Sequence, residues 1–164
     1  ATIVHSVKAC LISRFKFWNT SGFKVGSLLD NGITVFIDLT EANERPSYLE
    51  VLHRERRKRA IHTKYIRFPI KDRSVPDVML IAELIKLINN ETDSGKGVYI
   101  HCFRGLGRTG LAVGCYLKEL KDRHEDVFKS LAIMRTGVAA DFRSSPETEE
   151  QVQFVRDWST EPTD

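Results

Sequence analysis

Cysteine is scarce in this chain, and a long apolar run is absent. Three cysteines, an odd number, occur among 164 residues, which excludes the disulfide framework of small secreted domains. No run approaches the roughly eighteen apolar residues that a membrane-spanning helix needs, and residues 1–10 lack the charged-then-apolar order of a signal peptide. We therefore expect a protein without a transmembrane segment that resides in the reducing cytoplasm.

A large excess of one charge sign is also absent. The chain has 25 basic and 22 acidic side chains and a formal net charge of +3, so its overall charge does not indicate a nucleic-acid partner. The basic residues do cluster at 53–59, which includes Arg54 and Arg59. This stretch could attract an acidic substrate, a lipid surface or RNA, but a solvated helix face is the commoner explanation.

Linkers, repeats and low-complexity tracts are absent as well. With 41% hydrophobic residues, a chain of this length can bury one sizeable core and is too short for two ordinary domains. We predict a single domain over residues 1–164.

Apolar patterns along the chain predict alternating strands and helices. Runs typical of strands occur at 4–12, 33–39, 65–70 and 98–101. Helical patterns occur at 22–31, 48–60, 77–90, 111–121, 126–135 and 147–158. This order predicts an α/β fold with a central, mainly parallel sheet flanked by helices.

The most informative segment that is present is the run HCFRGLGRTG at residues 101–110. It lies between a predicted strand and a predicted helix, so its backbone N–H groups can surround an oxyanion near the positive end of the helix dipole. A phosphate dianion suits such a loop. We therefore predict a phosphate-binding loop formed by Phe103, Arg104, Gly105, Leu106, Gly107 and Arg108.

Three side chains of this run suit the cleavage of a phosphate ester. The positive field favours the thiolate of Cys102, which is the nucleophilic form of cysteine. Arg108 has a planar fork that matches two phosphoryl oxygens, which Lys cannot reproduce. Thr109 places a hydroxyl near the sulfur, where it can stabilise the thiolate. The other two cysteines, Cys10 and Cys115, are expected to be small buried hydrophobes.

The pattern His-Cys, two residues, Gly, two residues, Arg-Thr-Gly is similar to the active-site signature of the cysteine-dependent protein tyrosine phosphatase superfamily. Every defined position matches. The similarity continues with lower specificity over residues 33–158 and points to the compact dual-specificity branch, because the N-terminal third has no equivalent of the tyrosine-bearing recognition loop of longer enzymes. The resemblance implies a phosphatase-like fold, with a pocket shallow enough for phosphoserine and phosphothreonine as well as phosphotyrosine.

A phosphatase also needs a general acid, because phosphate esters leave slowly as bare alkoxides. Asp72 is the candidate, since it lies in the loop 71–76 that follows a predicted strand and ends at a proline. It resembles the aspartate of the family's acid loop, which also lies upstream of the cysteine. Asp77 is the competitor, but it lies at a predicted helix start, where a carboxylate has a capping role.

The segment 145–151 resembles the loop that positions water in classical tyrosine phosphatases. Gln151 matches the second glutamine of that loop, and Glu147 replaces the first. Gln151 is therefore a candidate for orienting the water that hydrolyses the intermediate. The same segment is also a good helix start, with Pro146 in the first turn and acidic residues at the positive end. Both interpretations remain open.

The resemblance further implies a two-step mechanism. Cys102 attacks phosphorus while the loop amides and Arg108 stabilise the equatorial oxygens, and Asp72 protonates the departing oxygen. Asp72 then activates the water that hydrolyses the phosphocysteine. His101 is expected to hydrogen-bond near Cys102 and hold the loop. The implied partner is a phosphorylated protein or peptide, and neither a metal nor a cofactor is required.

Three alternative functions remain open. A phosphoinositide phosphatase would use the same residues, although lipid-directed relatives tend to place lysines in the loop, where this chain has only Arg104 as an added cation. An RNA 5′-phosphate phosphatase shares the loop, and the basic stretch at 53–59 gives it modest support. A non-catalytic phosphate-binding module is the third, but the intact set of Cys102, Arg108 and Asp72 argues against it.

Overall fold

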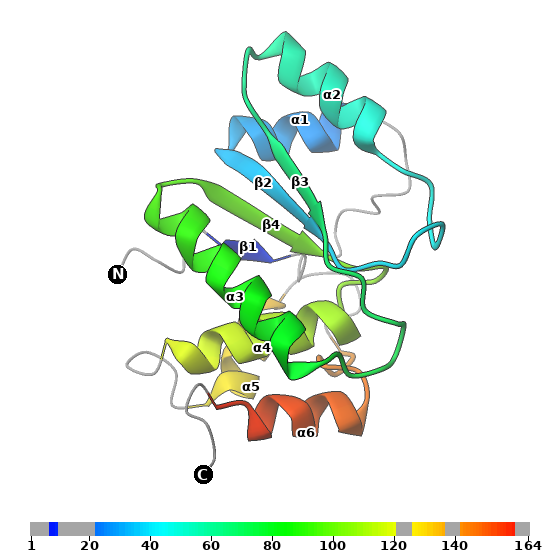
Figure 1. The fold of residues 1–164 in the computed structure, drawn as a ribbon, viewed down its shortest axis with the longest axis vertical. Coiled ribbons are helices and arrows are strands. Elements are labelled where there is room, and N and C mark those ends of the chain that lie inside the picture. The colour runs from blue at the N-terminus through cyan, green and yellow to red at the C-terminus, as the bar shows by residue number, and fades with distance from the viewer. Residues whose placement is uncertain (1–6, 10–21, 121–125, 137–141, 160–164) are drawn as a thin grey trace.

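The central sheet has four strands in the computed structural model, which describes residues 7–9, 22–120, 126–136 and 142–159. The strands are β1 (Val7–Ala9), β2 (Ile33–Asp38), β3 (Lys64–Arg67) and β4 (Gly97–His101), in the spatial order β1-β4-β2-β3. Every neighbouring pair is parallel. This arrangement confirms the predicted α/β class with a parallel sheet (Figure 1).

The predicted strand at 65–70 is too long at its carboxyl end, because β3 ends at Arg67. The N–H groups of Phe68 and Ile70 still donate to the carbonyls of Asp38 (2.9 Å) and Leu39 (3.1 Å). Pro69 lies between them and has no N–H to donate. The chain therefore follows β2 past the end of the regular strand and places the next loop beside the carboxyl end of the sheet.

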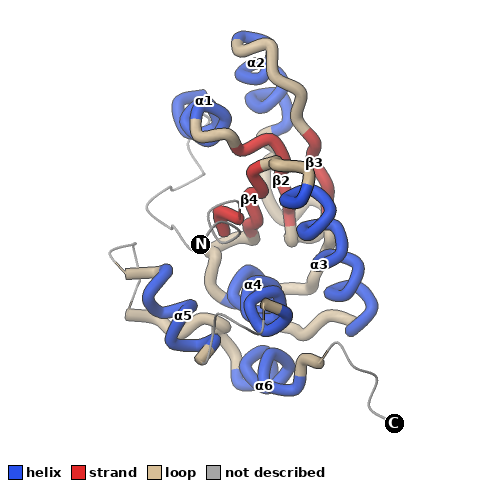
Figure 2. Tube along the Cα trace, turned by 90° about the vertical axis from the view of Figure 1, so that its left-hand side faces the viewer, coloured by secondary structure: helices blue, strands red, loops and turns tan. Residues whose placement is uncertain are grey.

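Helices cover both faces of the sheet (Figure 2). One face carries α1 (Gly22–Asp30) and α2 (Leu49–Lys58), and the other carries α3 (Val78–Asp93), α4 (Gly107–Glu119), α5 (Val127–Met134) and α6 (Glu149–Asp157). No helix of the described residues is long and apolar enough to cross a bilayer.

Two helices begin two or more residues away from their predicted start. The α4 helix starts at Gly107 rather than at residue 111, because the last residues of the 101–110 run already form its first turn. The α6 helix starts at Glu149 rather than at residue 147, because Thr148 is extended (φ −110°, ψ 156°) and its hydroxyl accepts a hydrogen bond from the N–H of Gln151. A residue of this kind is an N-cap and lies outside the helix.

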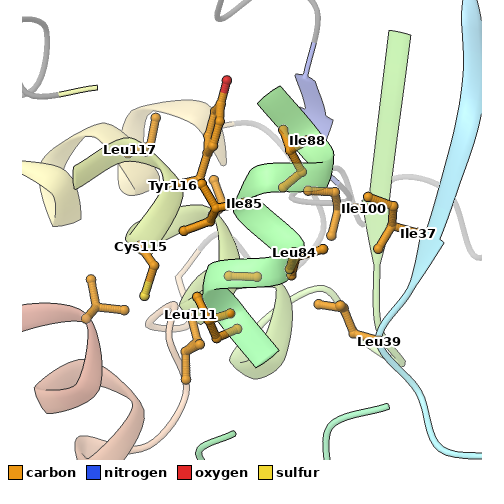
Figure 3. Packing of buried hydrophobic residues seen from close by; sticks show 14 of the residues in the cluster. Ile37, Leu39, Leu84, Ile85, Ile88, Ile100, Leu111, Cys115, Tyr116 and Leu117 are labelled. Atoms are coloured by element: carbon orange, nitrogen blue, oxygen red, sulfur yellow. The ribbon is translucent and has the colours of Figure 1, made fainter. Parts of the chain in front are cut away.

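The main hydrophobic core lies between the sheet and the α3–α6 layer. Ile37 and Ile100 from the sheet meet Leu84 and Ile88 of α3, all at most 1% exposed, and Figure 3 shows how closely these side chains lie. Cys115 of α4 belongs to this core with no exposed surface, and burial raises the pKa of its thiol. The prediction of a buried Cys115 is confirmed, whereas Cys10 lies outside the described residues.

The basic stretch at 53–59 forms the carboxyl half of α2 and its C-cap, and its Arg54, Lys58 and Arg59 side chains pair with carboxylates. The buried carboxylate of Glu55 lies 2.9 Å from Lys58 Nζ and 2.8 Å from Arg59 Nη1. Arg59 also pairs with Asp30 of α1 at 2.6 Å. These contacts join α2 to α1 and support the interpretation of the stretch as a solvated helix face with a structural role.

Candidate active site

The run 101–110 takes in the last residue of β4, a loop at 102–106 and the first turn of α4, in the strand, loop, helix order that the sequence predicts. Cys102 is 4% exposed, and its Sγ accepts a hydrogen bond from the N–H of Gly105 at 3.3 Å. Gly105 has a φ of +72°, a left-handed conformation that favours glycine. The loop therefore wraps around the Cys102 sulfur.

A cavity of about 410 Å³ opens at this loop. Its walls combine loop residues with side chains from the segments that follow β2, β3 and α5. The lining residues are Glu41, Glu44, Asp72, Arg73, Cys102, Phe103, Arg104, Gly107, Arg108 and Glu147. Two of the predicted phosphate-binding residues, Gly105 and Leu106, are not in this lining, and Leu106 is buried instead.

Arg108 is held by three hydrogen bonds. It is 1% exposed, and its two Nη atoms donate to the two carboxylate oxygens of Glu44 at 2.7 and 2.6 Å. Nη1 also donates to the carbonyl of Ile70 at 3.0 Å. The hydrogen bonds from Arg108 hold the pKa of Glu44 below its usual range. The buried Nε has no hydrogen-bond partner among the described residues.

Asp72 lies in the loop after β3 and faces the same guanidinium. Its Oδ1 is 3.0 Å from Arg108 Nη2, and its side chain is 63% exposed. The loop is held at both ends, because the Ile70 carbonyl accepts from Arg108 and the Ser74 carbonyl accepts from Gln151 Nε2 at 3.1 Å. This geometry brings the predicted acid, nucleophile and cation together in one cavity.

Asp77 is a helix cap. Its Oδ1 accepts a hydrogen bond from the N–H of Met79 at 2.7 Å, at the start of α3, and it is not among the cavity-lining residues. The capping role expected for Asp77 is confirmed. Of the two aspartates, Asp72 is therefore the one that lies beside Arg108.

Gln151 is fully buried at the start of α6. Its Oε1 accepts hydrogen bonds from the N–H groups of Glu147 (3.1 Å) and Thr148 (3.2 Å), which completes a capping box with Thr148. Its Nε2 donates to Ser74 of the Asp72 loop. A helix start in this segment is thus confirmed, but Pro146 precedes the Thr148 N-cap and lies outside the first turn, where it was predicted. Gln151 also joins α6 to the acid loop. A role in orienting water stays a prediction.

His101 is buried beneath the loop. Its Nε2 lies 2.8 Å from the hydroxyl of Tyr48, and its Nδ1 lies 3.4 Å from the carbonyl of Cys102. Burial lowers the pKa of His101 to about 4, so the ring is neutral at neutral pH. The buried carboxylate of Asp38, which accepts from Tyr65 at 2.6 Å, lies 3.8 Å from Nδ1.

Thr109 lies in the first turn of α4 and has no exposed surface. Its hydroxyl has no hydrogen-bond partner among the described residues, so the expected proximity to the Cys102 sulfur stays a prediction. Within the described ranges, no three His, Cys, Asp or Glu side chains lie close enough together to hold a metal ion.

Several residues of this site carry no signal in the sequence. Glu44 lies in an irregular segment after β2 and Tyr48 lies just before α2, and no motif distinguishes either residue. Asp38 offered a weak signal, since it is a charged residue at the end of an otherwise apolar strand.

The neutral state of His101 predicts a pH-dependent stability. In the unfolded chain an imidazole takes up a proton at about pH 6.5, whereas the folded protein keeps His101 neutral down to about pH 4. Below pH 6.5 the unfolded state therefore binds more protons, and stability falls as the pH falls. We expect the free energy of unfolding to drop by about 2 kcal/mol between about pH 7.5 and pH 5, measured by urea denaturation.

The control for this prediction is a second histidine. His101→Asn should flatten the profile over that range, and His53→Asn should not, because His53 is exposed on α2. A slope that persists in His101→Asn would assign the pH dependence to other groups.

Sequence comparisons relate the chain to proteins of known class. A family model described as "Polymorphic toxin system, DSP-PTPase phosphatase" matches residues 16–121. The 197R protein of Invertebrate iridescent virus 6, named as a tyrosine phosphatase, is 32% identical over 129 residues, which cover 76% of this chain and 42% of the viral protein. The chain therefore spans less than half the length of that relative.

Solved structures share the fold. The structure of Tk-PTP in its active form has a TM-score of 0.63 at 22% identity and covers 84% of this chain and 85% of that one. The structure of DUSP15 has a TM-score of 0.64 at 18% identity and covers 94% of this chain and 83% of that one. At these identities the likeness concerns the fold alone.

Proposed function

This chain belongs to the cysteine-dependent dual-specificity protein tyrosine phosphatase family, and we propose that it hydrolyses phosphotyrosine, and also phosphoserine and phosphothreonine, in proteins or peptides. The observation that carries the proposal is the convergence of Cys102, Arg108 and Asp72 on one cavity of about 410 Å³. A binding module would need the cation and the loop amides, but it would need neither a wrapped thiol nor a carboxylate 3.0 Å from the cation.

In the proposed first step, the Cys102 sulfur attacks phosphorus and the oxygen of the substrate side chain leaves. Arg108 and the N–H groups of the loop stabilise the charge on the three equatorial oxygens. Asp72 donates a proton to the departing oxygen, so the leaving group is a neutral alcohol or phenol. The product of this step is a phosphocysteine at residue 102.

In the proposed second step, water attacks the phosphocysteine. Asp72, now a carboxylate, accepts a proton from this water, and the Cys102 thiolate leaves. The buried amide of Gln151 acts through the Ser74 carbonyl, 3.1 Å from its Nε2, and so keeps Asp72 over the cavity. Thr109 is proposed to stabilise the departing thiolate. All of these groups belong to the protein, and a reducing compartment keeps the thiol active.

The experiment that tests this proposal is trapping of the intermediate. Reduced protein with a chelator present should hydrolyse an aryl phosphate and a phosphotyrosine peptide, and acid quenching during turnover should leave one phosphoryl group on the peptide that contains Cys102, detected by mass spectrometry. Phosphoserine and phosphothreonine peptides, a phosphoinositide in mixed micelles and RNA 5′-triphosphate complete the substrate panel.

Each result of the panel has a defined meaning. Faster turnover of the phosphoinositide or the RNA than of the peptides would make that compound the substrate in place of a protein, with the same mechanism. Loss of activity on chelation would contradict the proposed chemistry. Folded, reduced protein that binds phosphate and hydrolyses none of the substrates would be a binding module.

A further inference from the structure

Arg45 contacts the phosphate-binding loop from outside the cavity. Its Nη1 donates to the carbonyl of Cys102 at 2.9 Å, and its Nη2 donates to the carbonyl of Phe103 at 3.4 Å. Its Cζ also lies 5.4 Å from the centroid of the Phe103 ring. The cavity lining includes the neighbouring Glu44 but not Arg45. One guanidinium thus holds two successive carbonyls of the loop on the side away from the ligand.

The position of a carbonyl determines the direction of the next N–H. In a trans peptide unit the C=O and the N–H point in opposite directions within one plane. When Arg45 holds the carbonyls of Cys102 and Phe103 outward, the N–H groups of Phe103 and Arg104 point to the cavity side. The N–H of Gly105, which points at the Cys102 sulfur at 3.3 Å, agrees with this direction.

The loop needs such an outside contact. N–H groups that converge on one point repel each other and favour other orientations when no anion is bound. Arginine suits the task, because its planar fork places two donors at a fixed spacing, whereas lysine has a single ammonium group. The adjacent Glu44 holds Arg108 through both carboxylate oxygens. Glu44 therefore holds the Arg108 guanidinium, and the next residue, Arg45, holds the peptide units that carry the phosphate-binding N–H groups.

We propose that Arg45 is a positioning residue that orients the Phe103 and Arg104 N–H groups toward bound phosphate. The kinetic part of this inference rests on the proposed function, while the binding part does not. These donors meet the charge that develops on the equatorial oxygens, so Arg45 supports the transition state more than the ground state. Substrate affinity should therefore depend on Arg45 less strongly than kcat does.

The test uses the full chain with Arg45→Met, Arg45→Lys and the control Arg57→Met. Arg57 is an exposed cation of α2, so its replacement removes one positive charge away from the loop. Binding of tungstate, a phosphate-like oxyanion, is measured by calorimetry in a Cys102→Ser background. The kcat and KM values for an aryl phosphate are measured with Cys102 intact, and thermal unfolding identifies the variants that fold.

We expect Arg45→Met to bind tungstate about tenfold more weakly and to lower kcat about a hundredfold, with a smaller change in KM. Arg45→Lys should recover only part of both losses, because it restores the charge without the fork. Arg57→Met should match the parent protein. If Arg45→Met does not fold, Arg45→Lys alone carries the test.

Two results would overturn the inference. In one, Arg45→Met binds tungstate and turns over substrate as Arg57→Met does, which would limit Arg45 to packing. In the other, Arg45→Lys equals the parent protein in both measurements, so charge alone suffices. If the parent chain shows no turnover, the proposed function fails, and the tungstate measurement still decides whether Arg45 orients the amides.

Discussion

Cys102→Ser is expected to lower kcat for every substrate by about 10⁴-fold or more. A serine hydroxyl remains protonated at neutral pH, and His101 is not positioned to deprotonate it, since it is buried beneath the loop and contacts Tyr48 and the Cys102 carbonyl. The proposed phosphocysteine cannot form. The measurement is single-turnover hydrolysis of an aryl phosphate with reductant and a chelator present.

Phosphate binding should survive this substitution. Arg108 lines the cavity and keeps its anchor on Glu44, because neither contact involves the Cys102 side chain. The Cys102→Ser protein should therefore bind a phosphotyrosine peptide without cleaving it. The matched control is Cys115→Ala, because the Cys115 thiol is buried in the main core and burial raises its pKa. Retention of more than about one hundredth of the parent kcat in Cys102→Ser would place the nucleophile elsewhere.

Asp72→Asn is expected to give the second-largest loss, and one that depends on the leaving group. For phosphoserine peptides and alkyl phosphates, whose leaving oxygens need a proton, kcat should fall by about 10²- to 10³-fold. For aryl phosphates with acidic phenols the loss should be several times smaller, because these phenolates leave without protonation. The measurement is kcat against leaving-group pKa for the parent protein and the variant.

Asp77→Asn is the matched control for this prediction. Asp77 accepts the N–H of Met79 as the N-cap of α3, and asparagine caps helices about as well as aspartate. The kcat values of Asp77→Asn should match those of the parent protein for all leaving groups. Equal sensitivity of Asp72→Asn and the parent protein to the leaving group would remove the general-acid assignment from Asp72.

Three contacts tie the acid loop to the rest of the structure. Arg108 holds the Ile70 carbonyl, Gln151 holds the Ser74 carbonyl, and Arg73 pairs with Glu147 at 3.2 Å. The acid loop, the phosphate-binding loop and the start of α6 therefore form one connected unit. We expect a substitution at any of these contacts to shift Asp72 relative to Cys102 and so to change the rate of the proposed reaction.

The residues that meet in the site were predictable because their signal in the sequence is local. Within residues 101–110, the cysteine, the glycines and the arginine occur at fixed spacing between an apolar strand and a helix, and each residue type has a physical role that the spacing allows. The same holds for Asp72, which follows a strand, and for Asp77, which begins a helix. The alternation of strand and helix patterns likewise predicted a parallel sheet, because two parallel strands need a crossover between them.

The contacts that hold these groups were not predictable, because they join distant segments. Glu44 and Arg45 lie in an irregular segment without periodicity, and only the packing of that segment against the end of β4 places one on Arg108 and the other on the loop carbonyls. Gln151 matched a motif, yet its hydrogen bond to Ser74 depends on how α6 packs beside α4. The sequence by itself determined the candidate groups of the site and the fold class, since spacing and periodicity express them. The tertiary structure alone decided how those groups are oriented, since each orienting contact joins two segments that folding brings together.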